Sequence, residues 1–268
     1  MKIRTIARQT FASFLRNRLM IVFLSICVCI VLLMLTPLLG FKMMTTAANA
    51  GQMKAMVIGD IAAIMFFLSG VGSWLAAWAA ADSVASEMKA GTILAVMARP
   101  VKRWEFLLGK FLGVMTLMLV YVLMMFALSW ILALIAGERI DSTPWVLIAY
   151  PLVRYAMYSA LAMLLVTFFH PLVTLAITMV ISVGAMLLAP SEGGHNMFLP
   201  EWLRATFYSV FPSTGLLSEE RFYTLTQASL KQIGWLGHLT TLGYGLDYAF
   251  VCLVLAMWSF HYRSLARD

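Results

Sequence analysis

Three ionisable residues inside or beside long apolar stretches are the first candidates for chemistry. Arg154 lies about 14 Å into an apolar run that begins at Trp145, counted at the usual helical rise. A charge at that depth costs several kcal/mol unless it pairs, faces water or reaches the lipid headgroups. Arg154 is therefore a candidate to line a cavity and meet an anionic part of a substrate. The alternatives are a structural pair with Asp60 or Asp247, near the ends of other apolar runs, or a side chain that reaches the headgroups.

Motifs for catalysis are missing from the sequence. No Gly-rich loop ends in Gly-Lys-Ser or Gly-Lys-Thr, so the chain has no phosphate-binding loop of that kind. The 4 histidines are scattered without the spacing of zinc ligands, and no acidic cluster has metal-ligand spacing. We therefore expect no catalytic residue, no cofactor and no metal site in this chain.

Composition places the chain among helical membrane proteins. Apolar residues make up 62% of the 268 residues and charged residues only 12%, and the mean hydropathy is +0.90. The net charge of +7 comes from basic residues beside apolar runs, which is typical of contact with membrane lipids and not with nucleic acid. The fold class that follows is an all-α polytopic membrane protein.

Apolar runs of sufficient length predict six transmembrane helices. Residues 1–18 place apolar and basic side chains on opposite faces, which predicts an interfacial helix before the first span. The predicted spans cover about residues 19–39, 57–81, 111–135, 145–169, 172–189 and 242–260. An outer segment, residues 190–241, holds pieces too short to cross, and their aromatic residues favour the membrane interface.

Lys and Arg residues orient these spans. They are more numerous before the first span, in the loop 82–110 and after the last span than in the alternate loops. Basic residues stay preferentially on the cytoplasmic side. Both termini are therefore predicted to be cytoplasmic, in a multi-pass protein of the cytoplasmic (inner) membrane.

The loop 82–110 is the longest polar interruption near the amino terminus. Its first part, Ser83 to Met97, has apolar residues at roughly helical spacing and a cap candidate at Ser83 or Ser86. Gly91 lets another backbone approach closely, and Pro100 ends the helix. The pattern predicts a short amphipathic helix at the membrane surface.

The residues of this loop carry a resemblance to a known family. The order Glu87, Gly91-Thr92, Arg99-Pro100-Val101, Arg103-Trp104-Glu105-Phe106 and Leu108-Gly109-Lys110 resembles the loop between the second and third helices of ABC-2 type transporter permeases. In that family the loop forms a coupling helix that docks on the ATP-binding subunit. The resemblance implies that Glu87, Gly91 and Thr92 contact the ATPase, that Pro100 ends the helix, and that Arg99 and Arg103 hold headgroups or the partner. It also implies short interfacial or re-entrant helices before the last span.

The function implied by the resemblance is that of the permease subunit of an ATP-driven ABC-2 type transporter. The expected assembly has two permease halves, the second being another copy or a related chain, and two ATPase subunits that bind ATP and Mg. Because the family mostly exports, efflux of a lipid-like, drug-like or polymeric substrate is expected. One alternative is a channel or carrier without an ATPase, for which Pro37 and Pro151 are weak support. The other is a membrane-embedded enzyme or scaffold built around Arg154.

Overall fold

The computed structural model describes residues 2–17, 25, 28–29, 50–89, 102–136, 144–187, 217 and 235–262. These residues form helices and no strand, which confirms the all-α class for the part of the chain described. The helices are α1 (Lys2–Arg16), α3 (Ala50–Lys89), α5 (Arg103–Ala136), α6 (Pro144–Val166), α7 (Pro171–Leu187) and α11 (Trp235–Tyr262).

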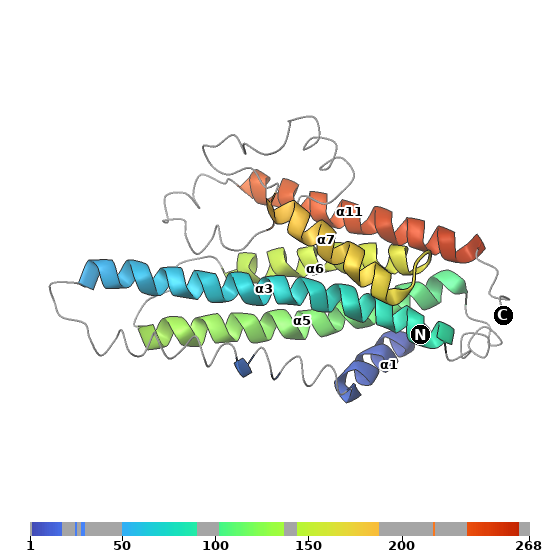
Figure 1. Ribbon diagram of the computed structural model, residues 1–268, viewed down its shortest axis with the longest axis horizontal. Helices are drawn as coiled ribbons and strands as arrows, with labels where there is room; N and C mark the ends of the chain where they lie inside the picture. Colours follow the sequence, from blue (N-terminus) through green and yellow to red (C-terminus); the bar gives the residue numbers. More distant parts are fainter. Residues whose placement is uncertain are drawn as a thin grey trace.

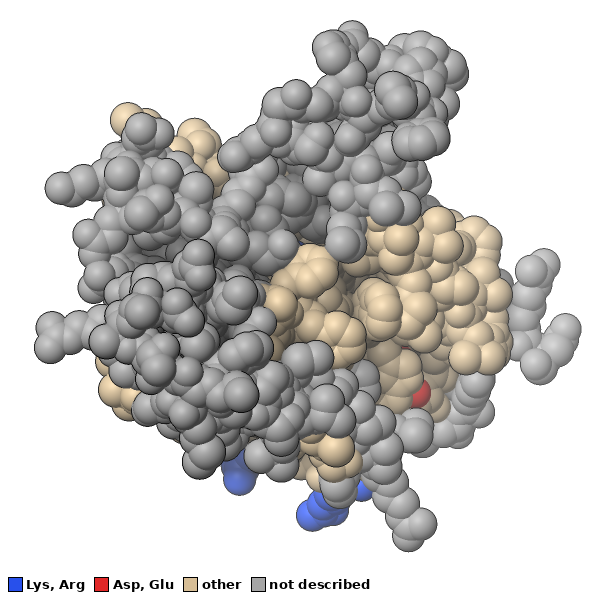
Figure 2. Space-filling view, turned by 60° about the vertical axis from the view of Figure 1, so that its left-hand side comes forward, with Lys and Arg blue, Asp and Glu red and all other residues tan. Residues whose placement is uncertain are grey.

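Four of the described helices, α3, α5, α6 and α11, are long and apolar enough to cross a membrane. They run along the long axis of the molecule in Figure 1. α7 contains only a shorter apolar stretch, Pro171–Gly184. In Figure 2 the described surface is mostly free of charged side chains, as expected of helices that face lipid. The protein is a polytopic helical membrane protein.

Several helices extend beyond the spans predicted from the sequence. α3 starts before and ends after the predicted span 57–81, and α5 starts at Arg103, ahead of residue 111. α11 starts at Trp235, inside the segment 190–241 that was expected not to span. Hydropathy reports the thickness of the apolar layer, whereas a helix continues past that layer until its backbone is interrupted. The first predicted span, 19–39, and most of 190–241 lie outside the described residues.

α6 is the central helix of the described bundle. Its membrane-crossing stretch is 78% buried by protein, compared with 28% for that of α11. At its centre Tyr155 packs edge-on against Tyr121 of α5, with ring centroids 6.1 Å apart. Both hydroxyls donate to backbone carbonyls of α3, Tyr121 to Leu68 at 2.8 Å and Tyr155 to Ser69 at 3.4 Å. The two phenol rings fit there because Gly72 has no side chain; a Cβ at Gly72 would lie 2.6 Å from Tyr121 Cε1.

α11 packs along α6, and the two helices run in the same direction. The hydroxyl of Tyr150 lies 2.8 Å from Nδ1 of His238 near the start of both helices. Further along, Gly245 allows Val153 to approach closely. Near the ends of the helices, the hydroxyls of Thr167 and Ser259 lie 3.1 Å apart. The sequence separation of the paired residues is 88 at the first contact and 92 at the last, so the two helices stay nearly in register along this contact, which we call the α6–α11 seam.

Candidate functional site

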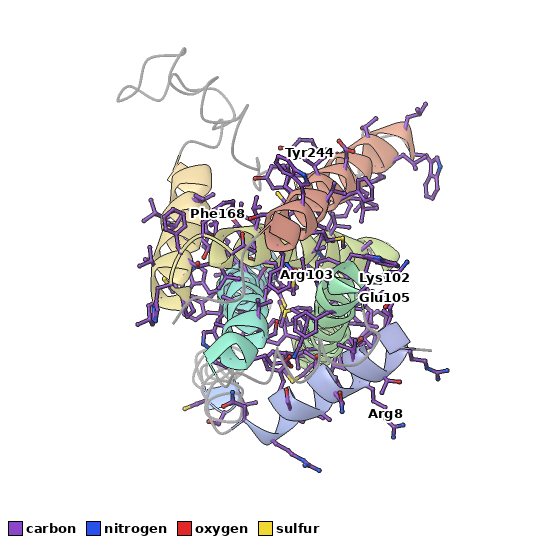
Figure 3. The ribbon with its side chains drawn as sticks, turned by 90° about the vertical axis from the view of Figure 1, so that its right-hand side faces the viewer. Arg8, Lys102, Arg103, Glu105, Phe168 and Tyr244 are labelled. Carbon is purple, nitrogen blue, oxygen red and sulfur yellow. The ribbon has the colours of Figure 1, made fainter. Side chains whose placement is uncertain are left out.

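The candidate site is the end of the bundle where the loop 82–110 was expected to couple to a partner. Here the last turns of α3, the first turns of α5, the end of α11 and the whole of α1 come together (Figure 1). Figure 3 looks along the bundle from this end and shows α1 along its lower side, beneath α3 and α5, with Arg8 pointing away from the other helices.

An ion pair joins the end of α3 to the start of α5. Nζ of Lys110 donates a hydrogen bond to Oε1 of Glu87. The Lys110 side chain is only 8% exposed and that of Glu87 is 27% exposed. Lys110 also lies over the ring of Phe106, with Nζ 5.6 Å from its centroid. Because so little water reaches Lys110, separating the pair would leave a charge without compensation.

α1 docks on α5 through two glycines. A Cβ at Gly109 would lie 2.8 Å from Ile6 Cγ2, and one at Gly113 would lie 2.6 Å from Thr10 Cβ. Such distances are too short for a side chain, so only glycine allows the two helices to approach this closely. Phe14 completes the contact against Trp78 of α3, with ring centroids 6.4 Å apart. The amphipathic helix predicted for residues 1–18 is therefore present, and its buried face rests on the protein.

Arg103 connects the start of α5 to the end of α11. Its Nη1 donates to the carbonyl oxygen of Phe260 at 3.2 Å, a favourable place for a cation because carbonyls at a helix C-terminus carry negative partial charge. The ring of Phe260 stacks on Phe106 at 6.2 Å. The first turn of α5 is closed by the carboxylate of Glu105, which accepts from the backbone N–H of Lys102 at 3.0 Å.

The predicted helix start at Ser83 or Ser86 is wrong. α3 passes both positions without interruption as far as Lys89. The Ser83 hydroxyl caps nothing; it donates to the carbonyl oxygen of Ala80, one turn earlier, at 2.8 Å. No glycine or proline lies between Gly72 and Gly91, and the alanines before Ser83 are strong helix formers, so nothing stops α3 there. Of the predicted coupling residues, Glu87 and Arg103 are at this end, while Gly91, Thr92, Arg99 and Pro100 lie outside the described residues.

Arg154 lies on α6, far from this end. It is 8% exposed, and its Cζ is 5.8 Å from the centre of the Tyr155 ring. The structure does not bring Asp247 to it: Gly245 faces α6, and two residues further on a helix points about 200° away, which leaves Asp247 exposed. Ser69 of α3 accepts a hydrogen bond from Tyr155, the neighbour of Arg154. The backbone of Asp60 is about 13 Å from that of Ser69 along the axis of α3.

A cleft of about 660 Å³ opens between α1 and the ends of α3 and α5. Most of the described residues that line it have polar or charged side chains, and both signs of charge are present. Gln9, Ala12, Ser13, Phe14, Arg16 and Asn17 of α1, Asp82, Ser83, Ser86 and Glu87 of α3, and Lys110 of α5 line it.

Sequence reasoning missed the ion pair and the docking of α1. The spacing Gly109-x-x-x-Gly113 was a usable signal, because small residues four apart are typical of close helix packing in membranes. The Glu87 and Lys110 pair had no local signal, since the two residues are far apart in the sequence and meet only when α3 and α5 pack.

The bundle defines a class, that of polytopic helical membrane proteins. The family model described as ABC-2 family transporter protein matches residues 4–265, nearly the whole chain. The chain belongs to the ABC-2 transporter family and is a membrane component of an ABC transporter. A search of curated proteins gives no match.

Proposed function

We propose that this chain is the permease subunit of an ATP-driven exporter and that a separate ATPase acts on the end of the bundle around Glu87. The proposed assembly contains two ATPase subunits, which bind ATP and Mg, and two permease halves. It sits in the cytoplasmic membrane with both termini on the ATPase side. The substrate class expected for such a family member is lipid-like, drug-like or polymeric.

The observation that supports this proposal most is the continuity of α3. Its 40 residues correspond to about 60 Å of helix, about twice the hydrocarbon thickness of a bilayer. One rigid element therefore reaches from Glu87 to the far end of the bundle. The ion pair to Lys110 links it to α5, so a force at this end acts on both helices.

Coupling then follows from linkage. An ATPase shifts the permease between two states only if its contacts differ in free energy between those states. Glu87, Gly91 and Thr92 are the proposed contacts, and Arg99, Pro100 and Arg103 shape and hold the segment that follows. Arg103 is well suited to this role because it also ties α5 to the last turns of α11.

The decisive experiment is a gentle detergent purification of the tagged chain from its native membrane, followed by mass spectrometry. Recovery of a subunit with a phosphate-loop sequence in about equal amount supports the proposal. Recovery of the chain alone, in a preparation where other membrane complexes stay intact, contradicts it and favours the channel or enzyme alternatives.

A substitution sharpens this test. Gly91→Trp is expected to abolish recovery of the ATPase while the permease still inserts. The matched control is Gly243→Trp on α11, where a Cβ meets nothing within 4 Å. Equal ATPase recovery with both variants would show that the contact lies elsewhere.

A further inference from the structure

The cleft between α1, α3 and α5 carries balanced charges on facing walls. Arg16 lies on the α1 wall, and Asp82 and Glu87 lie on the α3 wall, with Lys110 between them. Glu87 and Lys110 already pair with each other, so the opposite charges that a ligand meets on the two walls are those of Arg16 and Asp82. A ligand of a single charge sign would lie beside a like charge on one of these walls, which is unfavourable. The lining therefore favours a ligand that carries both a positive and a negative group.

The cleft also lies at the border between apolar and polar surface. The membrane-crossing stretch of α3, Ala63–Glu87, ends at this level. Leu15, the neighbour of Arg16 in α1, is 51% exposed, so this end of α1 presents an apolar side chain as well as the cation that lines the cleft. Headgroups with their acyl chains meet proteins at such borders.

We propose that this cleft binds the headgroup of a zwitterionic phospholipid with a primary ammonium group, of the phosphatidylethanolamine class. Its phosphate lies toward Arg16 and its ammonium group toward Asp82. The volume of about 660 Å³ is within the range of about 300–1,000 Å³ that is usual for small-ligand sites.

The lining favours a primary ammonium over a quaternary one. Quaternary ammonium groups are recognised by cages of aromatic rings. Among the described residues that line the cleft, Phe14 is the sole aromatic, and it already packs against Trp78. The carboxylate, hydroxyl and amide oxygens of residues such as Asp82, Ser86 and Asn17 instead accept hydrogen bonds, which only a primary ammonium can donate.

This proposal needs only that the cleft lie at a membrane surface. It does not depend on coupling to an ATPase, and it is tested on the purified permease chain. Failure of the lipid proposal therefore leaves the proposed transport function untouched, and the reverse also holds.

The test measures lipid binding by native mass spectrometry and thermal unfolding in detergent. Phosphatidylethanolamine, phosphatidylcholine and phosphatidylglycerol are added separately to the wild type and to Arg16→Gln and Asp82→Asn. We expect phosphatidylethanolamine to bind most tightly and to raise the unfolding temperature most. Each substitution should weaken its binding about tenfold. The control Arg8→Gln, on the same helix but pointing outward in Figure 3, should bind like the wild type.

Ser86→Trp is a second variant that fills the cleft without changing its charges, and it should also lose the bound lipid. Equal stabilisation by phosphatidylglycerol would show a basic anion site and overturn the proposal. Equal binding of phosphatidylcholine would show that hydrogen-bond donation plays no part, which also overturns it. So would unchanged binding in Arg16→Gln and Ser86→Trp.

Discussion

The two helix contacts that hold this molecule together differ in chemistry. At the α1, α3 and α5 end, close backbone approach at Gly109 and Gly113 is combined with the ion pair of Glu87 and Lys110. Along the α6–α11 seam, buried phenol, imidazole and hydroxyl groups meet instead. Separating the ion pair would leave Lys110 as a charge with little water around it, whereas breaking a seam hydrogen bond leaves only neutral polar groups unsatisfied. We therefore expect the ion pair to contribute more to stability than any single hydrogen bond of the seam.

The largest effect is expected from overpacking the interior shared by α3, α5 and α6. Gly72→Leu places atoms where the rings of Tyr121 and Tyr155 lie, and should cost about 3 kcal/mol of unfolding free energy. Thermal unfolding in detergent measures it. Gly70→Leu, whose Cβ meets nothing within 4 Å, is the matched control and should be close to neutral. Similar losses in both variants would mean that Gly72 is not closely packed.

The ion pair is tested next. Lys110→Met leaves Glu87 without its cation and should cost about 2 kcal/mol, less than a fully buried pair because Glu87 is 27% exposed. When Glu87→Gln is added to Lys110→Met, much of the lost stability should be recovered. A coupling energy near zero in this double-mutant cycle, measured by unfolding, would show that the pair does not join α3 to α5.

The docking of α1 on α5 predicts whether replacing Gly113 raises or lowers the unfolding free energy. Alanine in a helix interior is normally favoured over glycine by about 1 kcal/mol. Gly113→Ala should nevertheless destabilise by about 1 kcal/mol, because its Cβ would lie 2.6 Å from that of Thr10. Thr10 is buried in the wild type. The thiol of Thr10→Cys should therefore react more readily with a labelling reagent when Gly113→Ala is also present. Stabilisation with unchanged labelling would contradict the observed packing of α1.

The smallest effect concerns the seam. Tyr150→Phe removes the hydroxyl that lies 2.8 Å from Nδ1 of His238, and should cost about 1 kcal/mol of unfolding free energy. The loss should be smaller when His238→Phe is already present, since the partner is then gone. Additive losses in the two variants would show that the two rings are not coupled.

Much of the fold was predictable because it depends on local composition. An apolar run of about 20 residues is long enough to span a membrane, and it does so as a helix because a backbone in lipid has to satisfy its own hydrogen bonds. The amphipathic pattern of residues 2–16 likewise predicts a helix with one buried face. The family resemblance of the loop 82–110 was confirmed by the family match over residues 4–265.

The site was predicted less well. Glu87 was singled out as a contact for a partner, but its ion pair with Lys110 was not expected. Arg103 was expected to hold headgroups or a partner, and in the structure it donates to the end of α11. Both contacts join residues that are distant in the chain, and a hydropathy pattern contains no information on such distances.

By itself, the sequence determined the membrane class, the helical content and the set of loops that carries most of the positive charge. Each of these properties depends on residue types within one segment. Only the tertiary structure decided that α3 continues past Ser83, that α1 rests on α5, and that Asp247 points away from Arg154. These outcomes depend on which helix faces meet. That choice is made by close packing between segments, where one glycine or one buried charge decides how near two helices can lie.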